Sequence, residues 1–228
     1  MADVSSRPEQ DSLPSIVDPA HTAVLVIDMQ NDFCSPQGAA AKAGVDISMM
    51  HDILPPMIEL LREARRREIP IIFVQVLHAA DGHTVSPTHL RLLRKASPYA
   101  PFGLEGTWGA EIVPELERRP NEPIVVKHRS GGFCNTTLDS ILRSMEIKTT
   151  VIVGEQTPGC VEATVRGAED LDYCPVIVTD CVGGFNREIH EAALKVMVYR
   201  WPSATARQMA KAWDEALERS RPRVGLAP

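Results

Sequence analysis

The sequence lacks the features that define several large classes of protein. No apolar run approaches the roughly 20 residues that a membrane-spanning helix needs, so we expect no membrane partner. The five cysteines are irregularly spaced and form no CxxC or CxxH pair, which argues against a disulfide framework and against a zinc site. The net charge of −6 at pH 7 argues against a nucleic-acid partner. The cysteine pattern predicts free thiols in a reducing compartment, and we expect the protein to be cytoplasmic.

The amino-acid composition of the chain suits one globular domain. The chain has 228 residues, and hydrophobic residues make up 44% of them, which is enough for a sizeable core. Residues 1–18 are polar and rich in Pro and Ser, and they have no apolar core of the signal-peptide type. We predict a flexible N-terminal arm there. No shift in composition divides residues 19–228, which are predicted to form a single domain.

Apolar and amphipathic segments alternate along the chain. Strands are predicted at 23–27, 70–76, 123–126, 149–153 and 175–179 from their apolar, β-branched composition. Helices are predicted at 53–67, 88–95, 108–117, 137–145, 161–171, 187–198 and 204–219. Strands that alternate with helices form a parallel sheet with helices on both faces. The predicted fold class is therefore α/β, with three layers (α/β/α) and a mostly parallel, doubly wound sheet.

Cys160 occupies the most informative position in the sequence. It follows a predicted buried strand and a loop that carries Pro158 and Gly159, and a predicted helix begins at Val161. The free N–H groups and the positive end of a helix dipole favour a thiolate at such a junction, and ligands bind at the carboxyl ends of strands in open α/β sheets. A nucleophile is one interpretation of Cys160. A small buried hydrophobic side chain is the other, and position alone does not separate them.

Two charged residues also follow predicted strands. Asp28 comes directly after the strand 23–27, and Lys127 comes directly after the strand 123–126. Taken singly, an aspartate at a strand end is often a helix cap, and a lone lysine is usually a solvated surface charge. Because the strand ends of a parallel sheet share one edge, both residues can meet Cys160 in one crevice. There a thiolate can attack an acyl carbon, the carboxylate can move a proton and the ammonium can stabilise the thiolate.

Three segments of the chain resemble a known enzyme family. Residues 24–33 read VLVIDMQNDF, residues 126–133 read VKHRSGGF and residues 154–164 read GEQTPGCVEAT. In this order they resemble the three signature regions of the isochorismatase-like cysteine hydrolases. The resemblance extends from about His21 to Tyr199. It implies the three-layer fold of that family and a homodimer or homotetramer, and we expect no cofactor.

The resemblance also implies a role for each of the three residues at the strand ends. Cys160 corresponds to the nucleophile, Asp28 to the general base and acid, and Lys127 to an electrostatic partner. The isochorismatases of siderophore pathways, which cleave a vinyl ether, lack the cysteine. Its presence here favours an amidase.

The loop before Cys160 matches the family in part. The resemblance implies an oxyanion hole made by the backbone N–H groups of Gln156 and Cys160, and a non-proline cis peptide bond at Glu155–Gln156. Two residues depart from the usual pattern. The family mostly has a small or apolar residue at the position of Glu155, and Asn or Asp at the position of Pro158.

Three histidines, His78, His83 and His89, are spaced along the stretch that follows the second predicted strand. Imidazoles are good ligands for transition metals. Nicotinamidases of this family carry an Asp-x-His motif here, but residues 76–78 read Val-Leu-His, so the aspartate is absent. We therefore expect no metal, and we interpret His78 as a substrate contact or as part of a solvated loop.

The substrate class follows from weaker signals. Residues 133–144 resemble the corresponding segment of ureidoacrylate amidohydrolases, although the same residues also suit a helix start and a helix core. Together with the incomplete metal motif and the Thr-Pro-Gly-Cys loop, they favour a small ureido or carbamoyl compound, cleaved at a C–N bond through a covalent acyl-enzyme intermediate. The alternatives are a nicotinamidase-like or other small amide or hydrazide hydrolase and, in another class, a non-catalytic binding subunit.

Several residues near the strand ends are candidates for substrate binding. They are Gln30, Asn31, Phe33, Trp108, Arg129 and His78. The two aromatic side chains could form apolar walls or simply pack in the core. Arg129 could bind a substrate carboxylate or form a surface ion pair.

Overall fold

The strands form one six-stranded parallel sheet. The computed structural model describes residues 12–97 and 101–220. The strands are β1 (Thr22–Ile27), β2 (Ile71–Val76), β3 (Ile124–Lys127), β4 (Thr149–Glu155), β5 (Cys174–Gly183) and β6 (Ser203–Ala204). Their order in the sheet is β3-β2-β1-β4-β5-β6, and every pairing is parallel. The chain winds outward from β1 first to one side and then to the other, so the predicted α/β class is confirmed.

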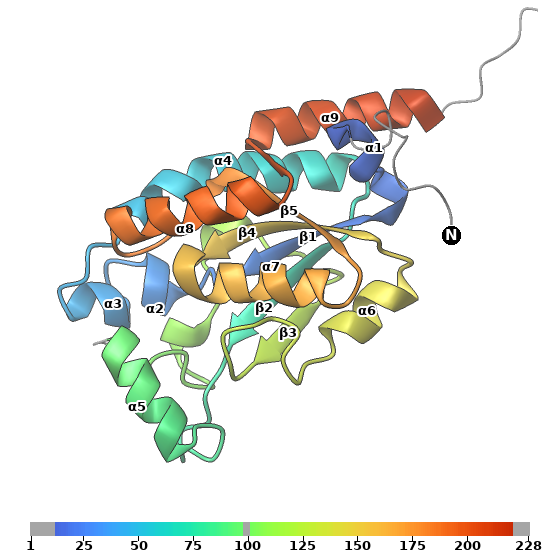
Figure 1. Cartoon of the computed structure of the whole chain (residues 1–228). Coiled ribbons are helices and arrows are strands. Elements are labelled where there is room, and N and C mark those ends of the chain that lie inside the picture. The colour runs from blue at the N-terminus through green and yellow to red at the C-terminus, as the bar shows by residue number, and fades with distance from the viewer. Residues whose placement is uncertain (1–11, 98–100, 221–228) are drawn as a thin grey trace, which may run out of the picture.

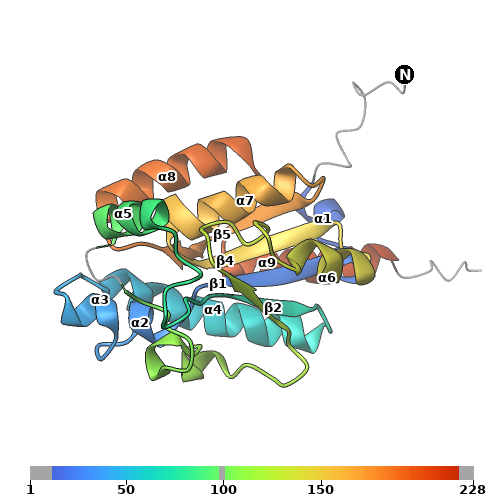
Figure 2. The same ribbon diagram turned by 90° about the horizontal axis from the view of Figure 1, so that it is seen from below.

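Helices cover both faces of this sheet, as Figure 1 and Figure 2 show. One layer holds α4 (Ser48–Arg66), α9 (Ala206–Ser220) and the short α1 (Leu13–Ile16), and the other holds α6 (Leu138–Ser144), α7 (Glu162–Glu169) and α8 (Arg187–Arg200). Side chains alternate along β1, because Val24 and Val26 join the first core whereas Leu25 and Ile27 join the second. A fully buried strand between two helical layers explains the continuous apolar run in the sequence.

Several elements differ from the prediction. Residues 108–117 form two 3₁₀ turns, η3 (Trp108–Ala110) and η4 (Pro114–Leu116), because Pro114 has no N–H group to continue one helix. The sequence also did not predict β6, α2 (Asn31–Cys34) or α3 (Ala39–Lys42). Among the described residues, no helix combines the length and the apolar character needed to cross a membrane.

The start of the described chain is ordered. Leu13–Ile16 form α1, Val17 is fully buried, and the Thr149 hydroxyl donates a hydrogen bond to the Ile16 carbonyl over 2.6 Å. The prediction of a flexible arm over residues 1–18 is therefore wrong for residues 13–18, where apolar side chains find a partner in the main core. The part of that prediction that concerns residues 1–11 lies outside the described residues.

The chain between β2 and β3 extends beyond the carboxyl ends of the strands. Its helix α5 (Pro87–Ala96) stands apart from the two helical layers, close to the edge where β1 and β3 end (Figure 1, Figure 2). The Ser86 hydroxyl caps α5 by accepting a hydrogen bond from the His89 N–H over 3.2 Å. A backbone bridge between His78 and Leu104 closes the base of this segment. The segment therefore forms an outer wall above the strand ends.

Candidate active site

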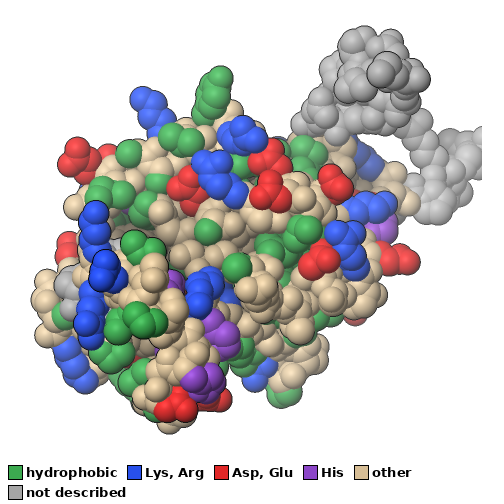
Figure 3. Space-filling model, turned by 60° about the horizontal axis from the view of Figure 1, so that its bottom comes forward, with side chains coloured by type: hydrophobic (Ala, Val, Ile, Leu, Met, Phe, Trp, Pro, Cys, Tyr) green, Lys and Arg blue, Asp and Glu red, His purple; other side chains and the backbone are tan. Residues whose placement is uncertain are grey.

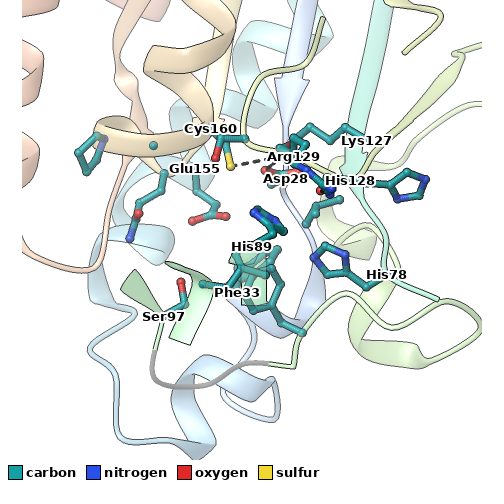
Figure 4. A pocket seen from close by; sticks show the side chains of 17 residues that line it. Asp28, Phe33, His78, His89, Ser97, Lys127, His128, Arg129, Glu155 and Cys160 are labelled. Carbon is teal, nitrogen blue, oxygen red and sulfur yellow. Dashed lines mark hydrogen bonds and ion pairs between the residues drawn. The ribbon is translucent and has the colours of Figure 1, made fainter. Parts of the chain in front are cut away.

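Asp28, Lys127 and Cys160 come together at the carboxyl edge of the sheet (Figure 4). The Lys127 ammonium nitrogen lies 2.7 Å from Asp28 Oδ2 and 3.2 Å from Cys160 Sγ. It also donates to the Arg129 carbonyl over 3.1 Å. Asp28 follows β1, Lys127 ends β3 and Cys160 follows β4, so three separate strands supply the cluster. The structure thus brings together three residues that span 132 positions of the sequence, from Asp28 to Cys160.

Backbone geometry at two strand ends sets this arrangement. Asp28 has a left-handed backbone with φ 50°, and its N–H donates to the Val74 carbonyl over 2.8 Å. Gly154 has φ 118°, and a Cβ atom there would lie 2.1 Å from the Ile27 carbonyl oxygen. Only glycine allows β4 to approach β1 so closely at this point. The loop that follows Gly154 is therefore held beside Asp28.

Cys160 belongs to a π-helical turn, η5 (Thr157–Val161), which continues into α7. This differs from the predicted position on the first turn of an α-helix. The Gln156 carbonyl accepts hydrogen bonds from the N–H groups of Gly159 and Val161, and the peptide bond between Glu155 and Gln156 is cis as the family resemblance implies. Gln156 and Cys160, the two residues predicted to form an oxyanion hole, both line the same cavity.

The electrostatics of the cluster are dominated by burial. Burial raises the pKa of the Cys160 thiol, and the Lys127 ammonium only partly opposes this effect. Loss of hydration thus opposes the thiolate that a helix end favours. Burial also raises the pKa of Asp28, again against the effect of Lys127. For Lys127 burial disfavours the charge, but Asp28 and Cys160 outweigh it and raise its pKa.

The cluster forms the floor of a cavity of about 300 Å³. Side chains from the segment between β2 and β3 form the opposite wall, among them His78, His89, Leu93 and Phe102. Histidine side chains gather on the face that is turned forward in Figure 3, beside Lys and Arg side chains. The cavity has room for a small molecule, and its walls carry both apolar and ionisable groups.

Half of the candidate binding residues line this cavity. Phe33, His78 and Arg129 do so. The Arg129 guanidinium donates to the Thr84 carbonyl over 3.0 Å and to the His128 carbonyl over 2.6 Å, both through Nη1. Arg129 is half-buried, and it contributes to the wall of the cavity.

Gln30, Asn31 and Trp108 do not line the cavity. The buried Gln30 amide donates to the carbonyls of Val76 and Ala110, over 3.0 and 2.8 Å. The Asn31 amide donates to the Trp108 carbonyl over 2.9 Å, while the Trp108 side chain is 48% exposed. The Gln30 and Asn31 side chains anchor the segment 108–110. The Gln30 and Asn31 amides thus bond the backbone, and none of the three predicted contacts lines this cavity, so their role in substrate binding stays a prediction.

His78 is buried, and neither of its ring nitrogens has a hydrogen-bond partner among the described residues. Its ring centroid lies 5.7 Å from that of Phe102 and 6.3 Å from that of His89. Burial, aided by the charge of His89, lowers the pKa of His78 to about 4. His83 instead pairs with Asp81 in an exposed loop. In residues 12–97 and 101–220, no three His, Cys, Asp or Glu side chains are arranged to hold a metal ion.

Glu155 is a site residue whose role the sequence did not predict. Its side chain lines the cavity, and the residue is only 3% exposed. Burial, followed by the nearby negative charge of Asp28, raises its pKa well above the ordinary value. The only sequence signal was the departure of Glu155 from the family pattern. Gln156, His89, Ser97 and Phe102 also line the cavity without having been predicted as substrate contacts.

Comparisons with known proteins show which family the chain resembles. The model of the isochorismatase domain matches residues 22–209. The ureidoacrylate amidohydrolase RutB of Agrobacterium fabrum (strain C58) is 35% identical over 185 residues, which is 77% of this chain and 79% of that protein. RutB of Caulobacter segnis is 33% identical over 214 residues, which is 88% of each chain.

Solved structures share the same fold. A cysteine hydrolase from Pseudomonas syringae pv. phaseolicola superposes with a TM-score of 0.77 at 23% identity, covering 88% of this chain and 96% of that one. An isochorismatase family protein from Desulfovibrio vulgaris superposes with a TM-score of 0.71 at 30% identity, covering 86% and 98%. The family predicted from the three signature segments is confirmed, and the chain belongs to the isochorismatase family.

Proposed function

We propose that the protein is a cysteine-dependent amidohydrolase that cleaves a C–N bond of a small ureido or carbamoyl compound. The observation that carries the proposal is the Lys127 ammonium, 3.2 Å from Cys160 Sγ and 2.7 Å from Asp28 Oδ2, on the floor of a cavity. A thiol, a carboxylate and an ammonium in direct contact are the groups that nucleophilic acyl transfer requires. The ureidoacrylate amidohydrolases among the relatives support the substrate class.

In the first step Asp28 takes the proton of the Cys160 thiol as sulfur attacks the carbonyl carbon. A base in contact with sulfur is needed because burial keeps the thiol protonated at rest. The raised pKa of Asp28 makes its carboxylate a stronger base. Lys127 stabilises the negative charge first on Asp28 and then, once the proton has moved, on sulfur. The N–H groups of Gln156 and Cys160 are the proposed donors to the carbonyl oxygen as it gains the electron pair of the C=O bond.

In the second step the C–N bond breaks. Asp28 returns the proton to the departing nitrogen, so that ammonia or an amine leaves and the carbonyl carbon stays bonded to Cys160 as a thioester or thiocarbamate. Water then attacks this carbon, with Asp28 again accepting a proton. The C–S bond breaks, and the Cys160 thiol is regenerated by that proton.

The size and charge of the cavity support a small anionic substrate. A volume of about 300 Å³ lies at the lower end of the range for small-molecule sites. Arg129 lines the cavity with part of its guanidinium still available, and it is the proposed partner of a substrate carboxylate.

A plain aromatic amide is the second candidate. Phe33 and Phe102 line the cavity, and their ring centroids are 5.1 Å apart at 66°, which gives the site an apolar wall for an aromatic ring. A nicotinamidase from Bacillus subtilis shares the fold, with a TM-score of 0.67 at 24% identity. Turnover of nicotinamide in preference to every ureido compound would favour this candidate.

Ammonia release from a panel of compounds tests the proposal. The panel contains ureidoacrylate, biuret, N-carbamoyl amino acids and nicotinamide, each incubated with wild type, Cys160→Ala and Cys134→Ala. Cys134 is an exposed free cysteine, so its variant is a matched control. We expect a ureido compound to be hydrolysed by wild type and by Cys134→Ala, and not by Cys160→Ala. A folded wild type that hydrolyses nothing in the panel would favour a non-catalytic binding subunit.

A further inference from the structure

The buried side chain of Glu155 lines the site, and one of its carboxyl oxygens has no hydrogen-bond partner in the described part of the chain. Glu155 ends β4 and is opposite Gly183 of β5 in the sheet register. Its atom Oε2 has no hydrogen-bond partner among the described residues. Figure 4 shows the carboxyl group pointing into the cavity, on the side of Cys160 away from Lys127. A buried acceptor without a partner is costly, so such a group is expected to meet a ligand.

We propose that Glu155 is a specificity-determining residue that hydrogen-bonds the substrate nitrogen that stays on the carbonyl carbon after the C–N bond breaks. The inference rests on the proposed function, and it gives a physical reason for a preference for ureido compounds over carbon amides.

The sides from which groups approach and leave the carbonyl carbon lead to this assignment. Sulfur must approach the carbonyl carbon, and the departing nitrogen must face Asp28, which protonates it. The remaining substituent of that carbon therefore points away from the ion pair of Asp28 and Lys127. Glu155 lies on that side of Cys160, and it directly precedes Gln156, a proposed oxyanion donor.

The nature of that substituent separates two classes of substrate. In a ureido or carbamoyl compound it is an N–H group, which can donate to the carboxyl oxygen of Glu155. In a carbon amide it is a CH₂ or an aromatic carbon, which would leave Oε2 unpaired while the substrate excludes water. A site with a buried polar group discriminates strongly against a ligand that leaves this group unpaired.

The protonation state of Glu155 fits this role. Burial and the charge of Asp28 raise its pKa well above the ordinary value, which favours the protonated, neutral form. A neutral carboxyl group offers one acceptor and one donor, as a glutamine amide does. It also adds no second negative charge beside the Cys160 thiol.

The experiment compares two compounds that differ in one group. Ureidopropionate and glutaramate have the same length and the same carboxylate, but an N–H of the first is a CH₂ in the second. Their kcat/KM values are measured with wild type, Glu155→Gln and Glu155→Met, both of which keep the side-chain size. Glu162→Gln, in an exposed ion pair with Arg166 on α7, is the matched control. Thermal unfolding checks that each variant is folded.

We expect Glu155→Met to lower kcat/KM for ureidopropionate about 10- to 100-fold, and for glutaramate no more than about 3-fold. Glu155→Gln should keep most of the discrimination because it can still accept the N–H. Equal losses on both compounds in Glu155→Met, or loss of the discrimination in Glu155→Gln, would overturn the role of Glu155 and leave the proposed function standing. Wild type without activity on any ureido compound would overturn the proposed function first, and the role of Glu155 with it.

Discussion

Strand β3 has a buried ion pair at each of its two ends, and the two pairs are built differently. Before the strand, Glu122 binds Arg65 of α4 in a bidentate pair with distances of 2.7 and 3.0 Å. At its end, Lys127 binds Asp28 over 2.7 Å. The side chains are 11% and 6% exposed in the first pair, and 0% and 1% exposed in the second.

The first pair is closed by further hydrogen bonds. Arg65 also donates to the carbonyls of Leu116 and Glu117, and Glu122 also accepts from the Arg119 N–H over 2.7 Å. The second pair instead faces a cavity and contacts a thiol. Burial alone therefore does not identify a functional ion pair. What distinguishes the pair of Asp28 and Lys127 is that one side of it is left open to a ligand.

The largest expected effect comes from replacing the carboxylate at the open pair. Asp28→Asn should lower kcat/KM on a turned-over substrate by about 10³-fold or more, because the thiol loses its base and the leaving nitrogen loses its acid. Glu122→Gln, which weakens the closed pair, should stay within about 2-fold of wild type because it is remote from the cavity. Steady-state kinetics on both variants measures this difference. Equal losses of kcat/KM in the two variants would contradict the distinction between the open and the closed pair.

Replacement of Glu122, which should hardly change activity, should instead lower the stability of the fold. Glu122→Gln leaves the Arg65 charge buried with no carboxylate, which should lower the free energy of unfolding by about 2–4 kcal/mol. Glu59→Gln, in an exposed ion pair with Arg62, should change it by less than about 0.5 kcal/mol. Urea unfolding of the three proteins measures both values. A loss of the same small size in both variants would show that the closed pair does not stabilise the fold.

The cavity at the carboxyl edge of the sheet should also make the stability of the protein sensitive to acid. Since burial and His89 lower the pKa of His78 to about 4, the folded state resists a proton that the unfolded state takes up near pH 6.5. Stability from this group is complete above pH 6.5 and is lost as the pH falls towards 4. At pH 5 the loss is about 2 kcal/mol, and His78→Gln should remove it. Urea unfolding at pH 7.5 and pH 5 tests this, with exposed His51→Gln as the control; the same pH dependence in His78→Gln and wild type would contradict it.

Much of the fold could be predicted from the sequence, because apolar strands and amphipathic helices are local patterns. The short elements could not. Helices α2 and α3 depend on Asp32, whose carboxylate accepts hydrogen bonds from the N–H groups of Ala39 and of the distant Gly103. The two residues of β6 form a strand only because β5 lies beside them. Such elements depend on contacts that no sequence window contains.

The site also contains features that the sequence predicts and features that depend on distant contacts. Strand ends converge by topology, which is why Asp28, Lys127 and Cys160 could be selected together. The structural role of the Gln30 amide could not be predicted, because its hydrogen-bond partners are 46 and 80 residues away along the chain. Glu155 was noticed only as an unusual residue, because burial of a side chain cannot be read from one sequence. The oxyanion hole, the homodimer or homotetramer, the cytoplasmic location and the absence of a cofactor stay predictions.

Trapping of the covalent intermediate tests the central claim most directly. Wild type and Cys160→Ala are mixed with a turned-over ureido substrate, quenched in acid and analysed by intact-protein and peptide mass spectrometry. The account predicts an adduct on Cys160 whose mass is that of the substrate less the departed ammonia or amine, and neither adduct nor turnover in Cys160→Ala. Ammonia release by Cys160→Ala at the wild-type rate, with no adduct on the wild-type enzyme, would contradict it.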